Sequence, residues 1–187
     1  SREAMIASLA EPAMLLIVFS LALIAGATQL STIAAFMNSP DVGLRVSLGM
    51  SLIALIIVAL AENARIPVDN PATHLELTMV HEAMVLEYSG RHLAMIEFAA
   101  FLKLLLYLSL IACVFAPWGM VTAGAGFGAY ILGVAAYIGK LAVGGALLAG
   151  FETAIAKMRV FRVPDFLGAA LMLALLAMLL RFVSRSL

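Results

Sequence analysis

The chain has 187 residues with no formal net charge, of which 65% are hydrophobic and only 12% charged. Soluble domains are roughly half apolar and about a quarter charged, so this composition, with a mean hydropathy of +1.13, excludes a soluble fold and predicts an integral membrane protein. The balanced charge argues against nucleic acid as a partner.

Apolar runs long enough to cross a bilayer recur along the chain, and we expect about five transmembrane helices of about twenty residues each. The fold class is therefore all-α, because backbone groups in lipid must be hydrogen-bonded within their own segment and nothing here alternates like a barrel strand. Pro12 suits the first turn of the first helix and Pro40 a stop after it. The expected spans, in a single membrane domain over 1–187, are 13–37, 44–61, 92–117, 127–150 and 166–183.

The basic residues favour one orientation of these spans. The positive-inside rule predicts a cytoplasmic N-terminus and a cytoplasmic loop over 62–91. In that orientation the cytoplasmic side carries more basic residues (Arg2, Arg65, Arg91, Lys157, Arg159 and Arg162) than the opposite side (Arg45, Arg181 and Arg185).

The loop contains a second predicted element. After an Asn-Pro break, the stretch 74–88 is expected to form a short amphipathic helix. Glu76 and Glu87 fall within about 40° of one another on its helical wheel, while His74 and His81 lie on the opposite side. Two carboxylates on one face are consistent with a proton-conducting role, and an ordinary surface helix gives the same pattern.

Lys103 and Lys140 lie near the centres of the third and fourth expected spans. A charged side chain at mid-bilayer costs at least about 2.5–3.5 kcal/mol, so each lysine needs a partner or a hydrated path. Buried ion pairs that fix helix packing are one interpretation. The other is a proton relay, because a buried lysine loses its proton readily.

Acidic residues are concentrated between the second and third spans and at helix ends on the same side. Glu97 and Lys103 point about 120° apart on one helix, so each needs a partner on another helix or another subunit. A file of carboxylates leading from the cytoplasm to the two lysines is the predicted proton path, with Glu62, Glu76, Glu82, Glu87, Glu97 and Glu152 as its members.

No motif predicts a catalytic or metal site. The string "HEAMV" at His81 lacks the second histidine of a zinc helix, and "GAGFGA" at Gly124 lacks the context of a nucleotide loop. The single cysteine, Cys113, lies in an apolar run and is interpreted as a small buried hydrophobe.

The stretch "RIPVDNPATHLELTMVHEAMVLEYSGRHLAMIE" resembles the signature of the membrane subunit of energy-converting group 4 NiFe-hydrogenases, of the formate hydrogenlyase and hydrogenase-4 type. That protein is itself similar to subunit 1 of respiratory complex I, the NADH-quinone oxidoreductase. The string "SREAMIASLAEP" also fits. The resemblance implies the later part of a family chain with about eight spans, each about twenty residues long.

The resemblance also implies a role. The chain would be a non-catalytic membrane-anchor and ion-coupling subunit in a bacterial or archaeal inner membrane, alongside antiporter-like membrane subunits. Its cytoplasmic loop would dock the hydrogenase large and small subunits, which would hold the NiFe centre and iron–sulfur clusters, with no cofactor in this chain. The expected docking residues, whose side chains suit charge-assisted bonds or match the family motif, are Arg65, Asp69, His74, His81 and Tyr88.

Two other functions remain open at this point. A quinone-site subunit of a complex I-like NADH-quinone oxidoreductase is disfavoured by Val68 and by "NPATH" over 70–74, where the quinone enzymes carry a more acidic stretch. A free-standing ion transporter is weakened because about five spans of about twenty residues show no obvious inverted repeat.

Overall fold

The computed structural model describes residues 2–39, 46–65, 68, 87–121, 124, 126–155 and 163–186, and in this part of the chain all regular structure is helical. The helices are α1 (Arg2–Ala25), α2 (Leu30–Met37), α3 (Val46–Glu62), α5 (Arg91–Phe115), α6 (Phe127–Ala154) and α7 (Val163–Ser186). By length and composition, four of the described helices can cross a membrane, and α3 is a shorter apolar helix. The predicted all-α membrane fold is confirmed.

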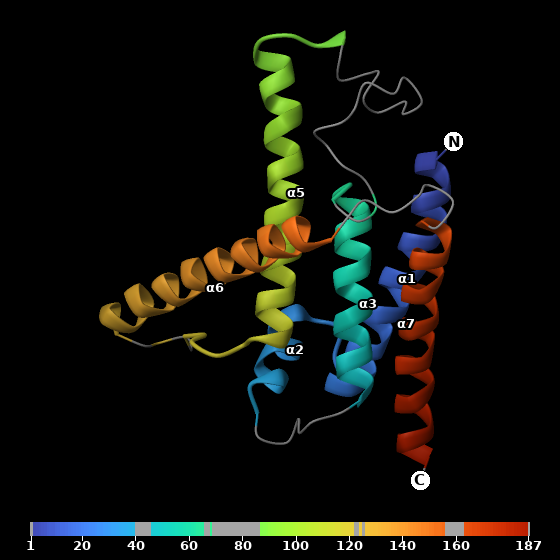
Figure 1. Cartoon of the computed structure of the whole chain (residues 1–187). Helices are drawn as coiled ribbons and strands as arrows, with labels where there is room; N and C mark the ends of the chain where they lie inside the picture. The colour runs from blue at the N-terminus through green and yellow to red at the C-terminus, as the bar shows by residue number, and fades with distance from the viewer. Residues whose placement is uncertain are drawn as a thin grey trace.

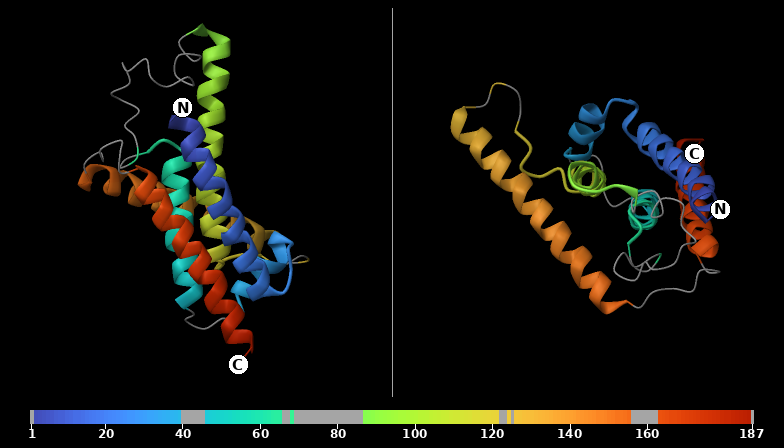
Figure 2. Two further views of the ribbon diagram at one scale, coloured as in Figure 1. Left: turned by 90° about the vertical axis from the view of Figure 1, so that its right-hand side faces the viewer. Right: turned by 90° about the horizontal axis from the view of Figure 1, so that it is seen from above.

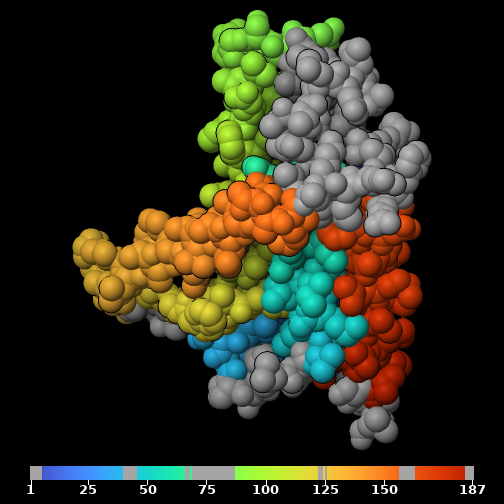
Figure 3. Space-filling view, in the orientation of Figure 1, coloured from blue at the N-terminus to red at the C-terminus, as the bar shows by residue number. Residues whose placement is uncertain are grey.

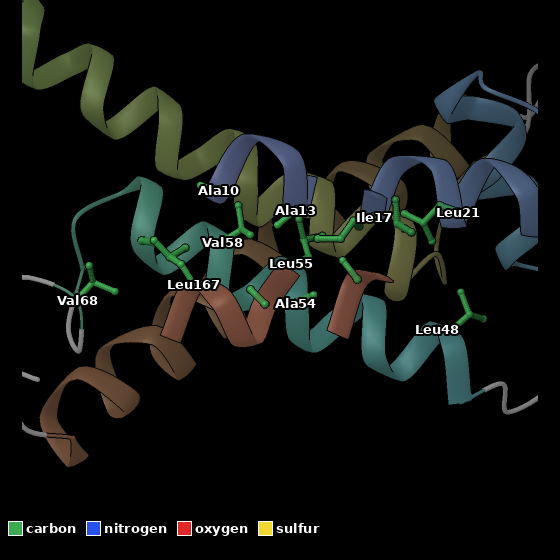
Figure 4. Close-up of a cluster of buried hydrophobic side chains, with 14 of the residues drawn as sticks. Ala10, Ala13, Ile17, Leu21, Leu48, Ala54, Leu55, Val58, Val68 and Leu167 are labelled. Atoms are coloured by element: carbon green, nitrogen blue, oxygen red, sulfur yellow. The ribbon is translucent and has the colours of Figure 1, made fainter. Parts of the chain in front are cut away.

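Helices α1, α3 and α7 pack together and form the core (Figure 1). Figure 4 shows the side chains that meet there, among them Ile17 from α1, Leu55 and Val58 from α3, and Leu167 from α7. Alanines at the contacts let the helix backbones approach closely, as is common between helices in lipid: Ala10, Ala13, Ala54, Ala170 and Ala174 are all buried.

A buried polar contact crosses this core between α1 and α3. The hydroxyl oxygens of Ser20 and Ser51 lie 3.1 Å apart. Ser20 donates to the carbonyl of Ile17 at 2.8 Å, and Ser51 donates to the carbonyl of Ser47 at 2.9 Å. Both hydroxyls are therefore satisfied inside an apolar environment, where an unpaired polar group would be costly.

Helix α6 lies outside this core, whereas α5 contributes the buried Val114 to it near its C-terminal end. The N-terminal part of α5 extends beyond the end of α3, and α6 runs crosswise to the other helices (Figures 1 and 2). No residue of α6 is buried, and the helix projects from the rest of the molecule (Figure 3). Its apolar side chains, such as Phe127, Leu132 and Leu147, are exposed. The N-terminal ends of α1, α5 and α7 and the C-terminal end of α3 point the same way (Figure 1).

The expected first span, 13–37, differs from the structure at both ends. Helix α1 begins at Arg2, because good helix formers precede Pro12, and the proline lies inside the helix rather than in its first turn. Helix α1 ends at Ala25, where Gly26 adopts a left-handed φ of 69° and its N–H donates to the carbonyl of Ala22. A separate helix, α2, follows, so one apolar run contains two helices.

The other expected spans, 44–61, 92–117, 127–150 and 166–183, correspond to α3, α5, α6 and α7 with shifted boundaries. The largest shift is at the end of α6, which continues to Ala154. Helix α7 begins at Val163 with Pro164 as its second residue. Proline is tolerated in a first helical turn, where its missing N–H has no intrahelical acceptor. Pro40 and most of the predicted helix over 74–88 lie outside the described residues.

Candidate functional site: ion pairs at helix ends

The last residue of α3, Glu62, meets Lys103 from the middle of α5. The ammonium of Lys103 lies 2.7 Å from the Oε2 atom of Glu62 and donates a second hydrogen bond, also 2.7 Å long, to the backbone carbonyl of Glu62. The Glu62 side chain is 22% exposed and that of Lys103 45% exposed. Lys103 thus finds an acid on another helix, as its position relative to Glu97 predicts.

Two features together stabilise the Lys103 charge. The carboxylate of Glu62 supplies a full opposite charge, and the charge-assisted hydrogen bond between them is short. The carbonyl of Glu62 belongs to the C-terminal end of α3, where unpaired carbonyls carry the negative end of the helix dipole. A lysine in the middle of one helix is therefore accommodated at the end of a neighbouring helix.

Arg65, which follows Glu62 closely in sequence, forms a second ion pair with Glu152. The Nη1 atom of Arg65 lies 3.5 Å from the Oε1 atom of Glu152, near the C-terminal end of α6, and the two side chains are 26% and 22% exposed. The end of α3 is thus joined to α5 through an acid and to α6 through a base. Sequence reasoning assigned Arg65 to docking and Glu152 to the proton path, and it did not foresee their contact.

Glu62 lines two cavities. One, of about 520 Å³, also has Asn63, Arg65 and Lys103 in its wall. The other, of about 390 Å³, is lined by Glu62 together with Glu11 of α1 and Tyr107 of α5. Glu62 is therefore accessible from two sides.

The second cavity contains two polar residues that the sequence analysis missed. Glu11 is an acid inside an apolar helix, and this was a usable signal, but the residue was assigned to the region before the first span. Tyr107 lies one helical turn after Lys103, which places both on neighbouring parts of the α5 surface.

Lys140, in the middle of α6, has a different environment. Its ammonium donates to the carbonyl of Ala116 at 2.6 Å and to the carbonyl of Trp118, both just beyond the C-terminal end of α5. Among the described residues no carboxylate lies within ion-pair distance of it. Lys140 therefore caps α5 and joins α5 to α6, next to a hydrogen bond of 2.6 Å between Ser109 and Tyr137.

The remaining predicted residues fall into two groups. Glu87, Tyr88 and Glu97 are exposed near the N-terminal end of α5, where the Tyr88 ring centroid lies 6.3 Å from that of His92. None of the three joins the Glu62–Lys103 contact. The others, Asp69, His74, Glu76, His81 and Glu82, lie outside the described residues. Within the described ranges no cluster of His, Cys, Asp and Glu could hold a metal ion, and Cys113 is partly buried.

These features define a class of protein: a multi-pass membrane protein in which two ion pairs join the C-terminal end of α3 to neighbouring helices. A family model described as NADH dehydrogenase matches residues 1–183, and the chain belongs to this family.

Two relatives from Escherichia coli (strain K12) agree with the resemblance seen in the motif at 65–97. Formate hydrogenlyase subunit 4 is 31% identical over 177 residues, which are 95% of this chain and 56% of the relative. Hydrogenase-4 component C is 33% identical over 123 residues, 64% of this chain and 36% of the relative. The chain thus spans about half, or less, of the length of these relatives.

Proposed function

We propose that this chain is a membrane-anchor and ion-coupling subunit of a hydrogenase complex, and that Glu62 and Lys103 exchange a proton within it. The observation that carries the proposal is the 2.7 Å contact between the Glu62 carboxylate and the Lys103 ammonium. Both residues line one cavity, and Glu62 also lines a second. The similarity to formate hydrogenlyase subunit 4 over 95% of the chain supports the hydrogenase context.

The chemistry of the pair suits proton transfer. The 2.7 Å between the Glu62 carboxylate and the Lys103 ammonium is within the reach that direct proton transfer requires. A proton that reaches Glu62 neutralises the carboxylate and weakens its hold on Lys103, which is then free to pass a proton to another acceptor.

The two cavities supply the two sides of such a step. Under this proposal, protons arrive from the loop side through Glu76, Glu82, Glu87 and Glu97. Glu152, the other acid of the predicted path, pairs with Arg65 and stays outside the route. The cavity with Glu11 and Tyr107 offers a continuation on the other side of Glu62. Glu11 can hold a proton, and the Tyr107 hydroxyl can donate and accept hydrogen bonds. Lys140 faces backbone carbonyls, which do not accept a proton at neutral pH, so we place it outside the path.

We also propose where this chain lies within its complex. The loop over 62–91 faces the cytoplasm of a bacterial or archaeal cell and docks the hydrogenase large and small subunits, which hold the NiFe centre and iron–sulfur clusters. Antiporter-like subunits lie beside the chain in the membrane. The pattern of basic residues supports this orientation.

Activity of the purified complex tests the class of function. We expect hydrogen evolution and no quinone reduction, because the stretch over 68–74 departs from the quinone enzymes. Both activities are measured on one preparation, with reduced viologen dye as electron donor for the first. Quinone reduction without hydrogen evolution would instead identify a quinone-site subunit.

Docking is tested by reversing charges in the loop. Arg65→Glu and Asp69→Arg should each weaken retention of the peripheral hydrogenase arm during salt washing and leave membrane insertion intact, because charge-assisted bonds to the arm would become repulsive. The fraction of arm retained on washed membranes is the measurement.

The contact between Arg65 and Glu152 requires a control, since Arg65→Glu also breaks it. Arg65→Glu combined with Glu152→Arg restores an intrachain pair with the charges exchanged, and Glu152→Gln removes the pair but keeps Arg65. A docking role predicts loss of the arm in the double variant and retention in Glu152→Gln. Full retention in the double variant would show that Arg65 acts within the chain alone.

A further inference from the structure

The turn that ends α3 has an uncommon backbone conformation. Ala64 has a φ of 49°, and among the described residues it is the sole residue other than glycine with a positive φ. Residues with a Cβ atom avoid this region, and such outliers persist where the surrounding structure holds them, often at functional sites.

The hydrogen bonds around Ala64 identify a Schellman turn. The N–H of Arg65 donates to the carbonyl of Leu60 at 2.9 Å, and the N–H of Ala64 donates to the carbonyl of Ala61 at 3.2 Å. The Asn63 side chain reinforces the helix end by donating to the carbonyl of Ala59 at 2.8 Å. This is the pattern in which a left-handed residue reverses the chain after a helix, a position usually occupied by Gly or Asn.

The turn separates two charges that a continuing helix would bring together. Residues three apart on a helix are surface neighbours, so Glu62 and Arg65 would form an ion pair if α3 extended by one more turn. The left-handed residue between them sends Arg65 to Glu152 on α6 and leaves Glu62 to Lys103 on α5. The end of the helix also leaves the Glu62 carbonyl free to accept from Lys103.

We propose that the left-handed turn at Ala64 is a positioning element that keeps Arg65 away from Glu62, so that the Glu62 carboxylate and carbonyl are both available to Lys103. Arg65 does not readily release its proton, so an Arg65–Glu62 pair would hold the carboxylate charged and remove it from proton exchange. The inference rests on the proposed function and adds Ala64 and Arg65 as positioning residues around the Glu62–Lys103 pair.

Two substitutions of similar size at Ala64 separate the backbone conformation from the side-chain volume. Asn tolerates a positive φ, whereas the β-branched Val does not. In the complete complex, Ala64→Asn should retain coupled proton uptake within about twofold of the wild type. Ala64→Val should lower coupled proton uptake about tenfold, because Arg65 would then reach Glu62, while hydrogen evolution with a viologen dye is unchanged. A tenfold loss corresponds to about 1.4 kcal/mol of transition-state stabilisation.

A second substitution tests whether Arg65 causes that loss. Adding Arg65→Gln to Ala64→Val removes the competing charge and should restore most of the coupled proton uptake, expressed per peripheral arm retained, because Arg65 is also a proposed docking residue. A merely structural defect would not be repaired by this change. The proposal is overturned if Ala64→Val and Ala64→Asn behave alike in assembled complexes, or if Arg65→Gln gives no rescue.

A third substitution guards against loss of folding. If Ala64→Val lowers the amount of complex, Ala64→Leu replaces it, because Leu also avoids a positive φ but is a strong helix former. Failure of both to assemble, with Ala64→Asn assembling normally, overturns the proposal in favour of a folding requirement. Glu62→Gln separates a failure of the proposed function from a failure of the inference about Ala64. Undiminished coupling in Glu62→Gln contradicts the proposed function itself, whatever the result at Ala64.

Discussion

Replacing Lys103 with methionine is expected to lower coupled proton uptake by at least about tenfold, equivalent to about 1.4 kcal/mol in the activation free energy. Methionine preserves the approximate length of the side chain but offers no proton and no hydrogen bond to Glu62, whose carboxylate and carbonyl both lose their 2.7 Å partner. The measurement is proton uptake by the reconstituted complex, alongside hydrogen evolution with a viologen dye, which should be unchanged.

Lys103→Arg is the matched variant that separates proton transfer from ion pairing. Arginine keeps the positive charge and can pair with the Glu62 carboxylate, but it stays protonated. If Lys103 passes a proton, both variants lose coupling. If the pair only fixes α3 against α5, Lys103→Arg keeps full coupling and Lys103→Met alone is defective, and Lys103 is then a structural residue.

Replacing Lys140 with methionine should mainly weaken the attachment of α6 to α5. The Lys140 ammonium binds the carbonyls of Ala116 and Trp118, and hydrogen bonds to charged groups contribute about 1.5–3 kcal/mol each. Losing them leaves carbonyls at the end of α5 without these donors, so we expect less assembled complex and a lower temperature of inactivation. Assembly, dye-linked activity and proton uptake are measured on one preparation.

The outcome at Lys140 decides between two roles. With a capping role, the assembled fraction of Lys140→Met remains fully coupled, and Lys140→Arg restores stability because the guanidinium also donates to carbonyls. Normal assembly with lost coupling would instead place Lys140 in the proton path that the sequence predicts. Normal assembly with undiminished coupling would remove it from both roles.

Composition determined the class of this protein without reference to its fold. An apolar fraction of 65% can be accommodated only in lipid, and backbone hydrogen bonding in lipid then requires helices or closed barrels. The motif over 65–97 predicted the relatives that the comparisons found. The position of Lys103 relative to Glu97 predicted that the acid paired with Lys103 would come from another helix, since residues six apart do not face each other. Each of these results depends on local composition or on the helical period.

Contacts between helices were decided by the tertiary structure alone. Hydropathy along the chain places Lys103 and Lys140 at the centres of their helices, but it does not show that their ammonium groups meet the carbonyl ends of α3 and α5. The left-handed Ala64 is equally invisible in the sequence, because alanine favours a helix that continues. The physical reason is that unpaired backbone carbonyls exist only where a helix ends, and packing determines which side chain from elsewhere in the chain reaches them.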